Sequence, residues 1–247
     1  KVKLGIVRFG EKKVKYFTVT RGEIPQKSST ATYMLNDDTG YIKVKNFGEN
    51  TYPELLIALA KLSQEGVENL IIDLRGNLGG FLNSAYQMAN EFLPKGRLIV
   101  YTQGRKSPRQ EYRSDGRGSY QQIPLIVLID ETSASASEIF AGAMQDNDRA
   151  TIIGRRSFGK GLVQQPIPFN DKSMVRLTIA RYYTPSGRCI QKPYTMGDEK
   201  SYEEDILVRY QHGEFFSQDS IKHSGKVYHT SIGRKVYGGG GITPDIF

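Results

Sequence analysis

The chain has 247 residues, of which 38% are hydrophobic and 24% are charged. These are ordinary values for a globular protein, so the sequence can bury a sizeable core. Its net charge of +8 comes from cations that are scattered along the chain and dense only at residues 105–117 and at Arg155 and Arg156. This pattern favours a solvated basic surface over a nucleic-acid groove, so we expect no nucleic-acid partner.

Two further features exclude other classes of protein. The sequence has no run of about 18 apolar residues, so we expect no membrane-spanning helix. Its single cysteine, Cys189, excludes an intrachain disulfide and a cysteine-rich metal site. No cluster of His, Asp and Glu has the spacing of metal ligands, and we expect neither a metal nor another cofactor.

The first 24 residues predict two short strands, at 2–7 and 14–20. Two strands alone bury little apolar surface. The chain also begins without methionine, in strand-like sequence. We therefore expect a trimmed or processed chain in which residues 1–24 are the end of a domain whose beginning is missing. Residues 25–247 would form the main domain.

Beyond residue 25, apolar runs alternate with segments of helical period. The run at 70–74 is continuous and bounded by glycines, as in a strand buried on both faces. Strands alternating with helices indicate an α/β fold around a mostly parallel sheet. We predict strands at 41–47, 70–74, 98–102, 125–129, 150–153, 163–167 and 173–183, the last two joined by a turn at Asn170 and Asp171. We predict helices at 52–63, 82–93, 138–146 and 202–210, and a loop at 103–122.

Ser133, Ser135 and Ser137 alternate with alanines between the strand at 125–129 and the helix at 138–146. A serine at such a turn exposes its Oγ, and the start of the helix supplies free N–H groups, which suits a nucleophile. Small residues at this position also let a helix pack closely on a sheet. Composition alone does not choose a nucleophile among the three.

A nucleophilic serine needs a general base. All the histidines lie near the C-terminus, at His212, His223 and His229, so a Ser-His-Asp triad would have to take one from there. Lys160 is the alternative. A free lysine has a pKa of about 10.4 and is almost fully protonated at neutral pH, so a lysine base needs an apolar pocket. The residues that we expect to supply apolar cover or positive charge are Ile139, Phe158, Val163, Arg155 and Arg156.

Two glycine-containing segments follow predicted strands. The first, DLRGNLGG at residues 73–80, suits an oxyanion hole, because glycines let backbone N–H groups approach a ligand, although a plain tight turn explains it equally well. The second, GRRSFGKG at residues 154–161, nearly matches the phosphate-binding P-loop. Gly161 replaces the hydroxyl residue that would contact Mg²⁺, and a strand follows instead of a helix, so we expect no nucleotide site.

Three polar residues near these segments have ordinary explanations as well. Glu138 and Asp146 fall on a predicted helix, where capping or ion pairs with Arg155 or Arg156 would explain them. Gln164 follows Lys160 closely enough for its amide to hold the lysine amine in place.

Taken together, these segments resemble the carboxy-terminal processing proteases, also called tail-specific proteases, of peptidase family S41. The resemblance covers residues 40–193 and returns at 238–245. Its marks are Gly40-Tyr41-Ile42, the segment at 73–80, residues 133–138, Gln145-Asp146, Phe158-Gly159-Lys160-Gly161 with Gln164-Gln165, and the terminal GGITPD. Several ordered motifs at the family's spacing are far more specific than any one of them.

The resemblance implies a serine endopeptidase with a Ser–Lys dyad. Ser135 would be the nucleophile, Lys160 the general base and Gln164 the residue that orients the lysine. The oxyanion hole would use the backbone N–H groups of Ala136 and of Gly79 or Gly80. Glu138, Asp146 and Ser157 would support the site.

The resemblance also implies a fold like that of crotonase and the Clp protease. A mostly parallel sheet would be layered with helices, with an additional strand-rich antiparallel layer, and residues 190–247 would complete the core. Residues 1–24 would be the remnant of a PDZ domain. Leu78 departs from the family's usual proline or glycine, a change that should leave the turn intact.

The partners implied are protein or peptide substrates with unfolded C-terminal tails, cleaved through an acyl-enzyme, and a second copy in a homodimer. The implied location is the bacterial cell envelope. A non-catalytic binding module is the main alternative, because the retinoid-binding repeats of photoreceptors resemble the same fold without needing a dyad. This chain keeps Ser135 and Lys160, which favours the enzyme.

Overall fold

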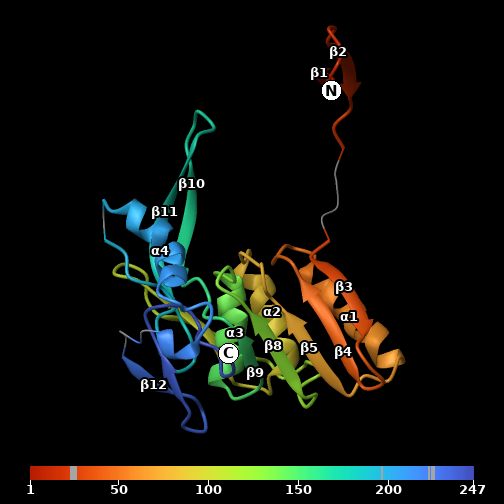
Figure 1. Cartoon of the computed structure of the whole chain (residues 1–247). Helices are drawn as coiled ribbons and strands as arrows, with labels where there is room; N and C mark the ends of the chain where they lie inside the picture. Colours follow the sequence, from red (N-terminus) through yellow and green to blue (C-terminus); the bar gives the residue numbers. More distant parts are fainter. Residues whose placement is uncertain (23–26, 196, 222, 224–225) are drawn as a thin grey trace.

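A computed structural model describes residues 1–22, 27–195, 197–221, 223 and 226–247. Its centre is a five-stranded sheet in the order β3-β4-β5-β8-β9 (Figure 1). β3 is antiparallel to β4, and the other neighbouring pairs are parallel. The strands are β3 (Ser29–Met34), β4 (Thr39–Val44), β5 (Asn69–Asp73), β8 (Leu125–Ile129) and β9 (Thr151–Gly154). The fold is therefore mixed α/β, with parallel and antiparallel strands.

Helices α1 (Thr51–Gln64), α2 (Leu82–Phe92) and α3 (Ala136–Asp146) pack with this sheet. Leu59, Met88 and Phe140 are fully buried in one core with residues of β5 and β8. Every residue of α3 is buried. Because α3 is enclosed along its whole length, its first turn is a rigid base for the residues that precede it.

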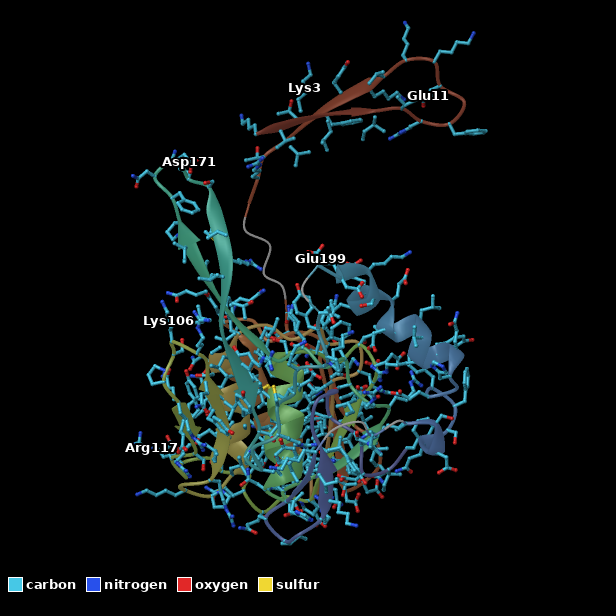
Figure 2. The ribbon with its side chains drawn as sticks, turned by 90° about the vertical axis from the view of Figure 1, so that its left-hand side faces the viewer. Lys3, Glu11, Lys106, Arg117, Asp171 and Glu199 are labelled. Atoms are coloured by element: carbon cyan, nitrogen blue, oxygen red, sulfur yellow. The ribbon has the colours of Figure 1, made fainter. Side chains whose placement is uncertain are left out.

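A second sheet has the order β10-β11-β6-β7 and is antiparallel. Its strands are β6 (Leu98–Gln103), β7 (Gln110–Arg113), β10 (Leu162–Pro168) and β11 (Met174–Tyr183). The β10–β11 hairpin was predicted with its turn at Asn170 and Asp171, and this is confirmed. The hairpin extends away from the body of the molecule, with Asp171 at its tip (Figures 1 and 2).

The C-terminal part contains α4 (Glu199–Gln211), a 3-10 helix (Gln218–Ser220), β12 (Val227–His229) and β13 (Lys235–Tyr237). The chain then returns to the central sheet, where Ile246 bridges to Ile153 of β9. The helix predicted at 202–210 is α4. Among the described residues, no helix is long and apolar enough to cross a membrane.

The predicted strands at the N-terminus are β1 (Val2–Ile6) and β2 (Lys15–Val19). Within the residues that the structure describes, they pair only with each other, in an antiparallel hairpin. Figure 1 shows this hairpin apart from the rest of the described chain. β3 was not predicted, and β7 lies in the segment predicted as a loop. Both are edge strands with many polar residues, so neither has the apolar pattern of a buried strand.

Candidate active site

The structure distinguishes the three serines that the sequence could not. Ser133 and Ser137 are fully buried, and their hydroxyls donate to the backbone oxygens of Leu74 at 2.8 Å and Asn77 at 2.9 Å. Ser135 is partly exposed, its Oγ caps the first turn of α3, and its hydroxyl donates no hydrogen bond within the described residues. Only Ser135 therefore presents a free hydroxyl to an incoming molecule.

Ser135 also has an unusual backbone. It is the residue immediately before α3, with φ 56° and ψ −112°. A positive φ is rare for a residue with a side chain and costs of order 1–3 kcal/mol, so it persists only where the surroundings enforce it. The buried hydrogen bonds of Ser133 and Ser137 hold the chain on both sides of this residue. The fold thus maintains a strained turn that projects the Ser135 side chain.

Of the two glycines at the end of the 73–80 segment, Gly79 lies against this turn and Gly80 lies against the backbone of Phe47. A Cβ atom on Gly79 would be 2.5 Å from the oxygen of Ala134 and 2.8 Å from the nitrogen of Ala136, and its φ is +96°. Only glycine fits there. The Gly79 N–H donates to Asn77 Oδ1 at 2.8 Å, whereas those of Gly80 and Ala136 have no acceptor among the residues that the structure describes. The serine turn therefore has one unused N–H donor at Ala136, and a second unused donor follows Gly79.

Glu138 connects the serine turn to the segment that carries Lys160. Its carboxylate is fully buried. One oxygen accepts from the backbone N–H groups of Ser135 and Lys160, each at 2.8 Å, and the other accepts from Ser157 Oγ and the Gly159 N–H, each at 2.6 Å. Burial raises the pKa of Glu138, and these hydrogen bonds oppose the shift. The backbone nitrogens of Ser135 and Lys160 are therefore no further apart than twice 2.8 Å.

The Lys160 side chain is exposed, so the expectation of an apolar pocket around it is wrong for this structure. Within the described chain, no hydrogen bond joins Lys160 to Ser135 or to Gln164, which is an exposed residue of β10. Arg155 pairs with Glu131, and Phe158 covers a different lysine. The structure brings the Lys160 backbone to the serine turn but leaves its amine in solvent.

Two other predicted residues are placed differently. Ser157 is buried, donates to Glu138 and accepts from the Ile242 N–H at 2.7 Å, so it links the site to the C-terminal segment that follows β13. Asp146 is at the opposite end of α3 from Ser135. It is buried and pairs with Arg188 at 2.7 Å, so it is not brought to the serine turn. No hydrogen bond connects a histidine to Ser135 in the part of the chain described above.

Sequence reasoning gave no separate role to Asp73, which begins the 73–80 segment. Its buried carboxylate accepts from Tyr41 Oη at 2.6 Å and pairs with Arg75 at 2.7 Å and Lys43 at 3.1 Å. Burial raises the pKa of Asp73, but the hydrogen bonds from Arg75, Tyr41 and Lys43 outweigh it and lower the pKa to about 2. A carboxylate at the end of a buried strand was the signal available in the sequence.

Asp73 should make the stability of the fold sensitive to acid. Its pKa is lower when folded than the ordinary 3.8, so its contribution is complete above about pH 4 and is lost as the pH falls towards about 2. Asp73→Asn is expected to lower the free energy of unfolding by about 2 kcal/mol at neutral pH and by little near pH 2. Urea unfolding across this range measures the difference, and an equal loss at every pH would contradict it.

Comparison with known proteins places these residues within one family. The model of peptidase family S41 matches residues 38–201, a range that includes Ser135, Glu138 and Lys160. A carboxyl-terminal-processing protease from Synechocystis sp. is 38% identical over 204 residues, which cover 81% of this chain and 47% of that protein. A carboxy-terminal-processing protease from Bartonella bacilliformis is 42% identical over 196 residues, covering 77% of this chain and 44% of that protein. The chain spans about half the length of these curated relatives.

A solved structure agrees with the sequence relatives. The photosystem II D1 C-terminal processing protease matches with a TM-score of 0.62 at 32% sequence identity. The match covers 72% of this chain and 49% of that chain.

Proposed function

Because this chain belongs to peptidase family S41, we propose that it is the core of a serine endopeptidase that cleaves proteins near or at their C-terminal tails. The observation that carries the proposal is the Ser135 turn. Of the three serines, only Ser135 has a hydroxyl that donates to no group of the described chain. The free Ala136 N–H follows it directly, and the Lys160 backbone is tied to the same buried carboxylate as the Ser135 backbone.

In the proposed reaction, Ser135 Oγ attacks the carbonyl carbon of a peptide bond while the neutral Lys160 amine takes the hydroxyl proton. The negatively charged oxygen of the tetrahedral intermediate accepts hydrogen bonds from backbone N–H groups. Collapse of the intermediate transfers the proton from the Lys160 ammonium to the leaving amine and leaves an acyl-enzyme on Ser135. Water, deprotonated by Lys160, then hydrolyses the ester.

The N–H groups of Ala136 and Gly80 are the donors we assign to the oxyanion. Both lack an acceptor in the described structure, whereas the Gly79 N–H is used by Asn77. Gly79 contributes by its lack of a side chain, because a Cβ atom there would collide with the backbone beside Ser135. One oxyanion donor of this kind stabilises a transition state by about 2.7–4 kcal/mol.

Lys160 must lose solvent and turn towards Ser135 before it can act as a base. Its backbone is already fixed by Glu138, so rotation of its flexible side chain is the only movement required of the lysine itself. We propose that an extended substrate strand covers this side of the turn, excludes water and lets Gln164 hold the amine. Substrate binding would therefore assemble the dyad.

The wider assignment follows from the same proposal. β1 and β2 would be the last strands of a PDZ domain, and the main domain would have crotonase-like layering. The partners would be proteins with unfolded C-terminal tails and a second copy of the chain, and the location would be the bacterial cell envelope.

Replacement of Lys160 by alanine tests the proposal. We expect hydrolysis of an unstructured protein tail to fall by between about a hundredfold and ten-thousandfold. The melting temperature should stay unchanged, because the side chain is exposed and forms no hydrogen bond in the described structure. Lys106→Ala, which removes another exposed lysine, should retain activity. Full activity of Lys160→Ala would remove lysine from the mechanism.

The alternative of a non-catalytic binding module gives a different result. A fluorophosphonate probe forms a covalent bond with an activated serine hydroxyl. Labelling of Ser135 in the intact chain supports the peptidase, and failure to label, combined with tight binding of an apolar ligand, supports the module.

A further inference from the structure

The segment that carries Lys160 is held from outside by the C-terminal part of the chain. Arg209 of α4 donates from Nη1 to the backbone oxygen of Ser157 at 3.1 Å. Arg209 also pairs with Glu214 at 2.8 Å, and the same carboxylate pairs with Arg156 at 2.7 Å. All three charged side chains are buried or nearly so. α4 thus fixes the backbone immediately before Lys160.

Lys192 is the second connection between α4 and the segment that carries Lys160, and it is unusual because its charged side chain is buried. Its side chain is only 4% exposed. Its Nζ lies 4.0 Å from the ring centre of Phe158 and 4.2 Å from that of Tyr202. It donates to the Tyr202 backbone oxygen at 2.9 Å and pairs with Asp205 at 3.1 Å. A cation held against two aromatic rings gains more when it is shielded from water, as here.

The backbone of Lys192 reaches the same segment directly. Its N–H donates to the oxygen of Gly159 at 2.9 Å, and the neighbouring Gln191 accepts from the Gly161 N–H at 2.9 Å. The residues on both sides of Lys160 are therefore bonded to residues 191 and 192. Phe158, expected to cover Lys160, packs against the Lys192 ammonium instead.

These contacts reach beyond the part of the chain that the family model matches. The match to the family model ends at residue 201, so Tyr202, Asp205 and Arg209 follow it. Glu199 lies at the start of α4, which in Figure 2 is on the other side of the molecule from the β10–β11 hairpin. Its apolar surface is modest, since Arg209 is its only buried residue. The helix is therefore attached mainly by the polar and aromatic contacts described here.

We propose that α4 is a clamp that positions the segment carrying Lys160, and that Lys192 is its principal positioning residue. Lys192 joins α4, through Tyr202 and Asp205, to Phe158 and Gly159 on the segment. It does not touch the reacting atoms. In the reaction we assign to Ser135, on which this role rests, Lys192 keeps the Lys160 backbone at the distance from which its amine can reach the serine.

Lys192→Met tests the clamp, because methionine replaces the lysine chain except for its terminal nitrogen and removes its charge. The Gly159 and Lys160 amides, which donate to Glu138, should exchange their hydrogens about tenfold faster than in the unchanged chain. kcat should fall by about tenfold or more with little change in KM, because misplacing a catalytic group by about 1 Å can cost a hundredfold. Lys192→Arg keeps the charge and should restore most of both properties.

Two controls separate positioning from general stability. Lys200→Met makes the same change on the exposed side of α4, where the side chain is 83% exposed, and should change neither measurement. Asp205→Asn removes only the ion pair, and should give a smaller effect of the same kind if Lys192→Met does not fold. Unchanged exchange at Gly159 and Lys160, or faster exchange spread equally over α3 and the central sheet, would overturn the clamp.

The exchange experiment also separates this inference from the proposed function. If the unchanged chain neither hydrolyses protein tails nor labels at Ser135, the peptidase assignment fails. Amide exchange at Gly159 and Lys160 still reports whether Lys192 positions the segment.

Discussion

Ser135→Ala is expected to abolish hydrolysis of protein tails and labelling by a fluorophosphonate probe. The hydroxyl is the proposed nucleophile, and the two neighbouring serine hydroxyls are buried and bonded to backbone oxygens, so neither can replace it. The free energy of unfolding should change by about 1 kcal/mol or less, because the lost hydroxyl donates to no group in the described chain and its Oγ only caps the start of α3. Mass spectrometry of the labelled protein and a urea titration measure both effects.

Ser133→Ala is the matched control for this prediction. It removes a hydroxyl that donates to the Leu74 oxygen at 2.8 Å and accepts from the Asp130 N–H at 3.0 Å, and so leaves that N–H without its acceptor. The expected loss of stability is about 1–3 kcal/mol, and labelling of Ser135 should remain. Ser135→Ala should therefore lose labelling with little loss of stability, whereas Ser133→Ala should lose stability and keep labelling. Covalent labelling that persists in Ser135→Ala would show that another residue is the nucleophile.

Glu138→Gln should have the largest effect on stability. The carboxylate accepts from four donors, at Ser135, Ser157, Gly159 and Lys160. Glutamine has one oxygen, so its NH₂ group must face two of these donors and leave them unsatisfied. At about 1–3 kcal/mol for each buried unsatisfied group, the expected loss is about 2–6 kcal/mol. Activity should fall with it, because the serine turn and the lysine segment lose their common acceptor.

Glu131→Gln provides the comparison, since it is the same substitution beside the same turn. Glu131 pairs with Arg155, whose side chain is 41% exposed, so the expected loss is below about 1 kcal/mol. Chemical unfolding of both variants at neutral pH measures the contrast. Equal stability of the two would show that Glu138 does not organise the site.

The main helices and central strands followed directly from the sequence, because their signals are local. The continuous apolar run at 70–74 and the helical period at 52–63 each arise from side chains a few residues apart, and the structure has β5 and α1 there. The edge strands β3 and β7 escaped prediction for the same reason. Their polar side chains face solvent, and what makes them strands is pairing with β4 and β6.

Parts of the candidate site were also predictable. The resemblance of the motifs to a known family singled out Ser135, Lys160, Glu138 and the glycines of the 73–80 segment as candidates, and the range matched by the family model contains them. Their geometry was not. The sequence could not show that one serine would be strained and free while its two neighbours were buried, because that difference depends on Leu74 and Asn77, which are distant in sequence.

By itself, then, the order of the amino acids determined the family, the alternation of strands and helices, and the candidate residues of the active site. The tertiary structure decided how these residues are used. Glu138 accepts hydrogen bonds from both the serine turn and the lysine segment, Phe158 packs against Lys192 instead of Lys160, and Arg209 of α4 binds the backbone of the lysine segment. The physical reason is the distance along the chain over which each kind of interaction acts. Secondary structure depends on neighbours within a few residues, whereas burial and hydrogen bonding depend on packing between segments that are tens of residues apart.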